Sequence, residues 1–216
     1  MVFFIYFFFY TFSHAQCFIF RSLVLKGEDF KRPMLPTRAI FLDRDGTIIE
    51  DKGHIASQED IELYPYAIRA LLALQEKYLL FIVTNQSGVS LGRITLAEAI
   101  YVNEYLMEVL AKSGVTIREF YCCSHKRDDH CDCIKPKPYF INKARAKYDF
   151  DIAQSYTIGD HPHDVDFGKN NGATGLYVLT GHGAKHMTEV AEGTPCFENL
   201  HDAATWILGQ GGPFIA

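Results

Sequence analysis

From Arg38 onward, short apolar runs alternate regularly with longer, helix-like stretches. The apolar runs are not interrupted at every second position by polar residues, which is typical of parallel strands covered on both faces. They occupy residues 39–42, 79–83, 117–121, 156–158 and 176–179. This order of elements predicts a doubly wound α/β sheet with right-handed crossovers.

Helical patterns lie between the apolar runs. Pro65 is expected at the first position of a helix that continues through residue 78. Thr95 and Glu98 have capping-box spacing and predict a helix that runs to about residue 112 and stops at Gly114. Further helices are expected over residues 138–148, 164–171 and 201–208.

The length of the chain, 216 residues, suits one ordinary domain with a full core and is short for two. We place that domain at residues 34–216. Two stretches within it, 46–63 and 123–137, lack a helical pattern and are long enough to be functional loops.

The N-terminal residues 1–33 require a separate interpretation, because the first twenty are strongly apolar and no Lys, Arg, Asp or Glu occurs before Arg21. They could be a signal peptide with a small-x-small site at Ser13 to Ala15, or a marginal membrane anchor. Alternatively, translation starts at Met34 and the preceding stretch is not part of the protein.

The net charge of −5 argues against nucleic-acid binding and favours a small-molecule substrate. We expect a cytoplasmic monomer, with export or membrane contact only if residues 1–20 are a genuine signal or anchor. Four of the six cysteines fall within twelve residues. This clustering favours a metal site in a reducing compartment over a disulfide framework.

The first apolar run ends in Asp43-Arg44-Asp45-Gly46-Thr47. Carboxylates at positions i and i+2 leave an extended segment on the same side, at the strand end where such sheets bind ligands. Asp43 could attack phosphorus, and Asp45 could protonate the leaving oxygen and then activate water. An ordinary Asp-Gly turn is the alternative, so the pair alone is weak evidence.

Complementary groups follow three later elements. Thr84 and Asn85 open a segment of hydroxyl and backbone N–H donors that could hold a phosphoryl oxygen, and Lys135 could add a positive charge. Asp160 and Asp164 supply two more carboxylates after the fourth strand. Together with Asp43 and Asp45 they would repel one another, so a hard divalent cation is needed, and Mg²⁺ fits best.

The cysteine-rich stretch contains a Cys-x-His and a Cys-x-Cys pair, which predict a structural, tetrahedral zinc site. The expected ligands are Cys123, His125, Cys131 and Cys133. Cys122 and His130 are alternatives, but adjacent ligands are awkward in one tetrahedral site, so Cys123 is preferred. A loop with inert thiols is the other interpretation.

These motifs resemble those of the haloacid dehalogenase (HAD) superfamily of phosphatases: FLDRDGT at 41–47, VTNQSG at 83–88, Lys135 in IKPKP, and IGDHPHD at 158–164. The resemblance implies a Rossmann-like core with 46–63 as a small flap and no large cap domain. It also implies that Asp43 is the nucleophile and Asp45 the general acid/base, with Thr84 and Lys135 holding phosphate. The magnesium ligands would be Asp43, Asp160 and the Asp45 main-chain carbonyl, with Asp164 accessory.

The zinc loop is similar to that of the D-glycero-D-manno-heptose 1,7-bisphosphate phosphatases and histidinol-phosphate phosphatases. Leu91 and Ile134 stand where that group has arginines, which weakens the expected recognition of a highly anionic substrate. A sugar bisphosphate phosphatase is the leading hypothesis and a histidinol-phosphate phosphatase the second. A non-catalytic, zinc-stabilised binding protein is the third. His54, in the flap, could contact substrate, and His161 follows the expected magnesium ligand Asp160. His182, His186 and His201 are expected to be surface or loop residues.

Overall fold

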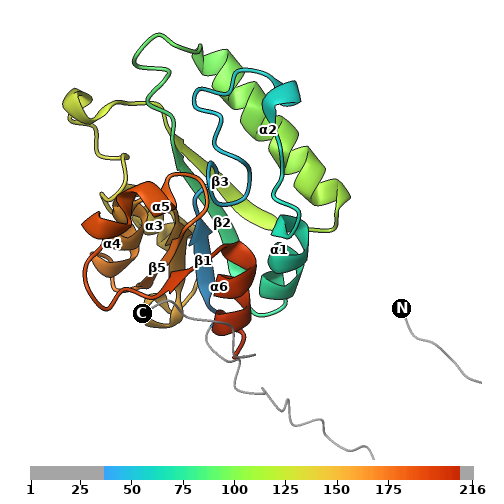
Figure 1. The fold of residues 1–216 in the computed structure, drawn as a ribbon, viewed down its shortest axis with the longest axis vertical. Helices are drawn as coiled ribbons and strands as arrows, with labels where there is room; N and C mark the ends of the chain where they lie inside the picture. The colour runs from blue at the N-terminus through green and yellow to red at the C-terminus, as the bar shows by residue number, and fades with distance from the viewer. Residues whose placement is uncertain (1–36, 210–216) are drawn as a thin grey trace, which may run out of the picture. The chain divides into compact units, whose positions relative to one another are not determined.

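The computed structural model describes residues 37–209 and shows a six-stranded parallel sheet with helices on both faces (Figure 1). The strand order is β3-β2-β1-β4-β5-β6. The strands are β1 (Ala39–Leu42), β2 (Leu79–Asn85), β3 (Ile117–Cys123), β4 (Tyr156–Gly159), β5 (Thr174–Val178) and β6 (Cys196–Phe197). The doubly wound, Rossmann-like α/β fold expected from the sequence is therefore confirmed.

Two hydrophobic cores lie on opposite faces of the sheet, because successive side chains of a strand point to opposite sides. Ile40 and Leu42 of β1 belong to the core covered by α1 (Ala67–Gln75), α2 (Leu96–Lys112) and α6 (Leu200–Ile207). Ala39 and Phe41 belong to the core covered by α3 (Tyr139–Lys147) and α4 (Pro162–Lys169). Both faces are apolar, which explains why the strand sequences do not alternate.

The helices follow the sequence pattern, except that α1 is shorter than the expected helix over 65–78 and ends at Gln75. Thr95 and Glu98 form both hydrogen bonds of the capping box, and α2 ends at Lys112, as expected. The prediction for Pro65 was wrong: α1 begins at Ala67, and Pro65 lies in the preceding turn. The sequence pattern also missed α5 (Gly183–His186) and strand β6, which are too short to show a period.

The register of the central strands places the predicted motifs at one edge of the sheet. Leu42 pairs with Ile82 on one side and with Ile158 on the other. Asp43 follows Leu42 directly, and its backbone N–H donates to the Ile158 carbonyl at 2.9 Å. Strands β1 and β4 also mark the point where the strand order reverses, which is where doubly wound sheets bind ligands.

The two predicted loops contain only short 3₁₀ turns, Gln58–Asp60 in the flap and Arg127–Asp129 in the cysteine loop. Within residues 37–209 neither loop carries a large cap domain, as expected. None of the described helices is long and apolar enough to cross a membrane. The apolar extension expected over residues 1–33 lies outside the described part of the chain.

Candidate active site

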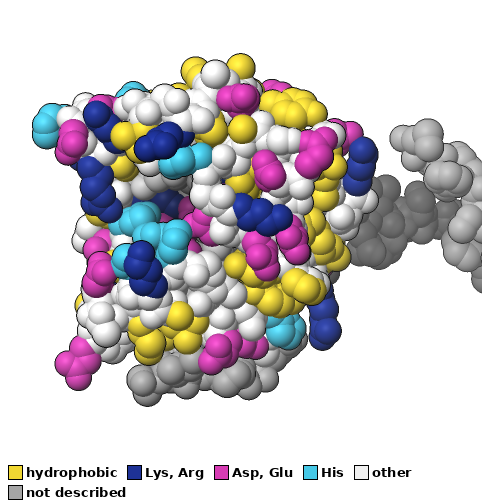
Figure 2. Space-filling view, turned by 45° about the horizontal axis from the view of Figure 1, so that its top comes forward, with side chains coloured by type: hydrophobic (Ala, Val, Ile, Leu, Met, Phe, Trp, Pro, Cys, Tyr) yellow, Lys and Arg dark blue, Asp and Glu magenta, His cyan; other side chains and the backbone are white. Residues whose placement is uncertain are grey.

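A cavity of about 470 Å³ opens at the carboxyl ends of the central strands. Its wall includes predicted site residues from three strand ends, namely Asp43, Asp45, Thr84, Asn85 and Asp160. Histidine side chains gather in a hollow on this side of the molecule, with lysine and arginine side chains nearby (Figure 2). The sheet thus brings together residues that are far apart in the sequence.

Lys135 is buried between two of the predicted carboxylates. Its Nζ lies 2.6 Å from Asp43 Oδ1 and 2.6 Å from Asp164 Oδ1, and it donates to the Val83 carbonyl at 2.7 Å. The Lys135 and Asp164 side chains are 2% and 3% exposed, whereas that of Asp43 is 11% exposed. Asp43 is therefore the member of this trio that an incoming ligand can reach.

The protonation of this trio follows from burial and from the lysine charge. Burial raises the pKa of Asp43 well above its usual value, and the Lys135 charge only partly opposes this. Burial also acts to raise the pKa of Asp164, but the Lys135 charge and hydrogen bond, with His163, bring it below the usual value. For Lys135 the two carboxylates outweigh burial and raise its pKa, so the ammonium stays charged.

Asp160 is almost fully buried and is confined by backbone on two sides. A Cβ added to Gly46 or Gly181 would lie 2.1 Å or 2.3 Å from Asp160 Oδ2, so only glycine fits at these positions. Both glycines also have positive φ, +75° and +57°. The His182 backbone N–H donates to Asp160 Oδ2 at 2.7 Å, which fixes the carboxylate further.

The carboxylates fit a hard divalent cation. One oxygen each of Asp43, Asp160 and Asp164 lie within 4.8 Å of one another. Carboxylate oxygens are the ligands that Mg²⁺ uses in proteins. Lys135 contacts only two of these three acidic groups, Asp43 and Asp164, which leaves negative charge for a cation to balance. Asp43 and Asp160 therefore face the same cavity, as the magnesium hypothesis requires.

Asp45 lies beside this group and is held by several donors. Its carboxylate accepts from Arg44 Nε and NH2, both at 2.9 Å, and from Gln86 Nε2 at 2.8 Å. Thr84 Oγ1 is 3.4 Å from Asp45 Oδ2, and Gln86 Nε2 also donates to Thr84 Oγ1 at 2.8 Å. Arg44 is fully buried and also contacts Asn103 on α2.

Asn85 connects the second strand to the loop that carries the lysine. The Lys135 backbone N–H donates to Asn85 Oδ1 at 3.1 Å. The Gln86 backbone N–H donates to the Cys123 carbonyl at 2.7 Å, which continues the link between the two strand ends. Asn85 therefore positions Lys135 as well as lining the cavity.

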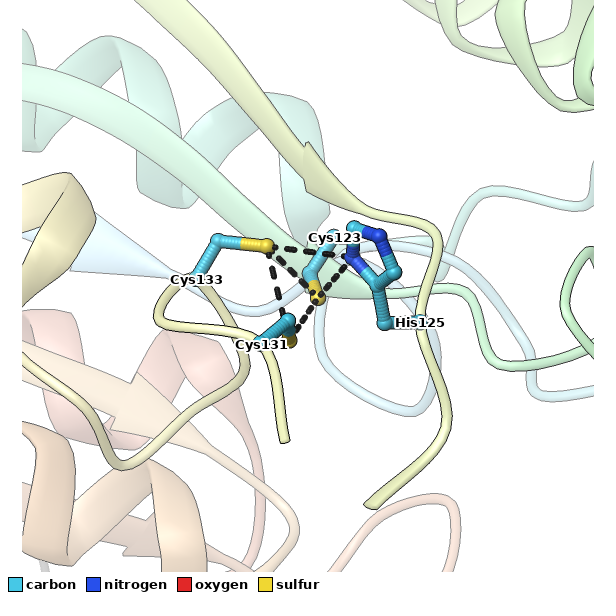
Figure 3. A group of neighbouring side chains, drawn as sticks. All are labelled: Cys123, His125, Cys131 and Cys133. Atoms are coloured by element: carbon cyan, nitrogen blue, oxygen red, sulfur yellow. Dashed lines mark hydrogen bonds between the residues drawn. The ribbon is translucent and has the colours of Figure 1, made fainter. Parts of the chain in front are cut away.

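The four predicted zinc ligands come together at the end of β3 (Figure 3). The sulfur atoms of Cys123, Cys131 and Cys133 are 3.0 to 3.7 Å apart, and His125 Nδ1 lies 3.7 Å and 3.4 Å from two of them. Four ligands at a tetrahedral zinc with Zn–S of about 2.3 Å would be separated by about 3.5 to 3.8 Å. The donor set and spacing thus fit Zn²⁺.

The two alternative zinc ligands lie apart from this group. The Cys122 side chain is hydrogen-bonded to Asn103 and lies near Arg44. His130 is exposed at the end of the 3₁₀ turn, with φ at 51°. Burial raises the pKa of Cys123, so this thiol would stay protonated unless a cation favoured its thiolate.

Several cavity residues were not assigned by the sequence reasoning. Gln86 and the buried Arg44 hold Asp45, although only their neighbours were given roles. Lys126 and Arg127 line the cavity from the cysteine loop. A pattern of a Cys-x-His pair followed by two basic residues could have drawn attention to them.

Leu91 and Ile134, the positions without the expected arginines, both line the cavity. His54 and His161 line it too, and contact between His54 and substrate stays a prediction. His182 also lines the cavity, although it was expected only to be a surface or loop residue. The His201 backbone belongs to α6, away from these residues.

Comparisons with known proteins show which family the chain resembles. The model of the HAD-hydrolase-like family matches residues 132–203. A D-glycero-beta-D-manno-heptose-1,7-bisphosphate 7-phosphatase of Vibrio cholerae is 33% identical over 181 residues, which is 79% of this chain and 96% of that protein. One of the same name from Helicobacter pylori is 37% identical over 139 residues, 63% of this chain and 80% of its own.

Solved structures show the same similarity. The D,D-heptose 1,7-bisphosphate phosphatase of B. bronchiseptica, complexed with magnesium and phosphate, superposes with a TM-score of 0.74 at 28% identity. The match covers 81% of this chain and 100% of that one. The corresponding enzyme from Burkholderia thailandensis gives a TM-score of 0.60 at 25% identity, over 80% and 99% of the two chains.

Proposed function

This chain belongs to the HAD-like phosphatases, in the family of the D-glycero-D-manno-heptose 1,7-bisphosphate 7-phosphatases, and is a phosphoric monoester hydrolase; we propose that it releases phosphate from a sugar bisphosphate through an aspartyl-phosphate formed on Asp43. The observation that carries the proposal is the position of Lys135 between Asp43 and Asp164. Of these three groups, Asp43 is the one that reaches the open cavity.

In the first step a carboxylate oxygen of Asp43 attacks phosphorus, and the bond from phosphorus to the ester oxygen breaks. Asp45 gives its proton to that departing oxygen. In the second step water attacks the aspartyl-phosphate, Asp45 takes the proton of the water, and Asp43 is released with free phosphate. Because Asp45 Oδ2 already accepts from Gln86, the carboxyl must exchange this partner for the substrate oxygen during the cycle.

Other side chains hold the phosphoryl group and balance its charge. Lys135 provides a fixed ammonium next to the attacking oxygen, and Thr84 and Asn85 line the cavity beside it. We assign Asp43, Asp160 and the Asp45 carbonyl to Mg²⁺, with Asp164 accessory through its contact with Lys135. When bound, Mg²⁺ would neutralise these carboxylates and attract the phosphate. Zn²⁺ at Cys123, His125, Cys131 and Cys133 would be structural.

The second phosphate of a bisphosphate substrate needs positive charge further from Asp43. Leu91 and Ile134 cannot provide it, but Lys126 and Arg127 line the same cavity. We propose that these two side chains replace the missing guanidinium groups, so that D-glycero-D-manno-heptose 1,7-bisphosphate or a similar sugar bisphosphate is accepted.

A histidinol-phosphate phosphatase is the second candidate, and the apolar Leu91 and Ile134 favour it because a monophosphate needs fewer cations. The histidine biosynthesis bifunctional protein of Blochmanniella floridana is 32% identical over 143 residues, but these are only 40% of that protein. We further propose that residues 34–216 act as a cytoplasmic monomer without nucleic-acid or membrane partners. The net charge of −5 argues against a nucleic-acid partner. Light scattering after size-exclusion chromatography tests the monomer.

The mechanism is tested with Asp43→Asn, which keeps the shape of the side chain and removes the nucleophilic carboxylate. We expect magnesium-dependent release of phosphate from p-nitrophenyl phosphate to fall by at least about 10³-fold. Asp149→Asn, at an exposed position outside the cavity, is the matched control and should keep full activity. Retention of more than a tenth of the activity by Asp43→Asn would exclude Asp43 as the nucleophile.

The substrate class is tested by measuring kcat/KM for heptose 1,7-bisphosphate, fructose 1,6-bisphosphate and histidinol phosphate. Replacing Lys126 and Arg127 with Met should raise KM for a bisphosphate at least tenfold and leave p-nitrophenyl phosphate unaffected. Lys77→Met, at an exposed position beyond the end of α1, serves as the control. A higher kcat/KM for histidinol phosphate, with no effect of the double variant, would favour the second candidate.

A further inference from the structure

Four histidines gather near Asp160, three of them in the cavity wall and one in an adjoining pocket. They come from the start of α4, His161 and His163, and from the segment at α5, His182 and His186. The ring centre of His161 lies 4.9 Å from that of His163 and 5.2 Å from those of His182 and His186. The mechanism proposed above uses none of these imidazoles.

The spacing of these groups suits ligands of a single ion. Donor atoms of Asp160, His161 and His182 lie within 4.8 Å of one another. An imidazole bound at about 2.0–2.1 Å has its ring centre about 3.2 Å from the ion, so two such rings at a tetrahedral angle are about 5.2 Å apart. The distance between the His161 and His182 rings has this value.

A second observation concerns the carboxylates that hold two of the rings. His182 Nδ1 lies 2.9 Å from Asp51 Oδ2, and His186 Nδ1 lies 2.6 Å from Glu189 Oε1. Metal-binding histidines in proteins usually donate their second ring N–H to a carboxylate in this manner, which orients the ring and leaves Nε2 free for the ion. The contact of His182 is not required for packing, since its side chain is 46% exposed.

We propose that Asp160, His161 and His182 form a second divalent-cation site, selective for an imidazole-binding transition metal such as Zn²⁺ or Ni²⁺. The ion replaces the hydrogen bond of 2.9 Å between His161 Nδ1 and Asp160 Oδ1, with His186 close enough to become a fourth ligand after a small side-chain movement. Two nitrogen ligands and one carboxylate distinguish this site from the all-oxygen set assigned to Mg²⁺.

The two cation sites share Asp160, so occupancy of one affects the other. A transition metal bound to Asp160 makes this carboxylate less available to Mg²⁺ and therefore weakens Mg²⁺ binding. By thermodynamic linkage, Mg²⁺ weakens the binding of the transition metal by the same factor. This coupling makes the histidine site inhibitory at low Mg²⁺ concentration. The inference does not depend on which phosphate ester is the substrate.

The test is calorimetric titration of the zinc-loaded, magnesium-free protein with NiCl₂. Wild-type protein should bind one Ni²⁺ per chain, and His182→Gln should weaken this binding at least tenfold. Asp51→Asn, which keeps His182 but removes the carboxylate that orients it, should weaken it about tenfold. His201→Gln on α6 is the matched control and should bind as the wild type does.

Two further measurements identify where nickel binds. Zinc analysis after gel filtration should show that the cysteine site of every variant stays loaded, which also shows that the variant is folded. Absorption bands of nickel bound to thiolate should be absent. The proposal is wrong if the wild type binds no Ni²⁺, if His182→Gln and His201→Gln bind it equally, or if only thiolate-bound nickel is found.

Discussion

The two predicted metal regions of this protein, the carboxylate cavity and the cysteine loop, are stabilised in different ways. Asp43 and Asp160 follow strands whose backbones are paired on both sides and whose side chains fill two cores. The charge of Asp43 is already balanced in part by the buried Lys135. This region is therefore formed by the fold itself and does not require a bound metal ion.

The cysteine loop has no comparable support. Between Cys123 and Lys135 the regular structure is one 3₁₀ turn, and most of its residues are exposed or partly exposed. Four of its side chains converge at the Cys123, His125, Cys131 and Cys133 group. One metal therefore uses a site that the sheet forms, whereas the other is expected to form the loop that binds it.

The largest expected effect tests the charge balance of the cavity. Lys135→Met keeps the length of the side chain and leaves the buried Asp43 and Asp164 carboxylates without their cation. We expect the free energy of unfolding in urea to fall by about 3–5 kcal/mol at pH 7. Lys143→Met, at an exposed position of α3, should change it by less than about 0.5 kcal/mol. Equal stability of the two variants would mean that Lys135 is not needed to balance these charges.

Zinc removal should have a smaller and more local effect. Cys131→Ser removes one predicted ligand, so zinc content should fall from one equivalent to near zero and protease should cleave within 124–134. The core should remain folded, because the loop contributes few buried residues. Cys122→Ser is a demanding control, since the neighbouring thiol points to Asn103 and its loss should leave zinc bound. Loss of zinc from Cys122→Ser instead would show that the assignment of Cys123 is wrong.

The smallest effect concerns the contact between the cysteine loop and the loop that follows β2. Ser90 Oγ donates to Asp129, and the Ser90 backbone N–H donates to the Ser124 carbonyl at 3.2 Å. Ser90→Ala should lower the free energy of unfolding by no more than about 1 kcal/mol and increase proteolysis of the loop. A double-mutant cycle with Asp129→Asn should be non-additive. Strict additivity would indicate that the two side chains do not interact in solution.

The fold could be predicted from the sequence because its strands are short, apolar and separated by helices. Strand β1 was placed at its observed bounds, and the capping box located α2, because both signals are local. Strand β6 has only two residues and pairs through Tyr177 and Val178, so its position depends on tertiary contacts that no local pattern carries. The prediction that Pro65 starts a helix was wrong because this residue lies in the turn before α1.

The candidate site was predictable where residue type and strand end coincide. Asp43 follows β1, Thr84 lies in β2, and Asp160 follows β4. Because these strands are parallel and in register, the three residues meet at one edge of the sheet. The contacts of Lys135 with both Asp43 and Asp164 could not be predicted, because they depend on the path of a loop without a periodic pattern. The histidine cluster was missed because α5 was not recognised as an element.

The close approach of the Gly46 and Gly181 backbones to Asp160 has an energetic consequence. With both glycines in contact distance and the His182 N–H on one oxygen, the Asp160 carboxylate has little rotational freedom left to lose. Ordering a free side chain costs conformational entropy. The Asp160 side chain loses this entropy when the protein folds, and not when it binds an ion. A cation arriving at this carboxylate should thus bind with little reorganisation of the protein, which would permit rapid exchange between the metal-free and metal-loaded states.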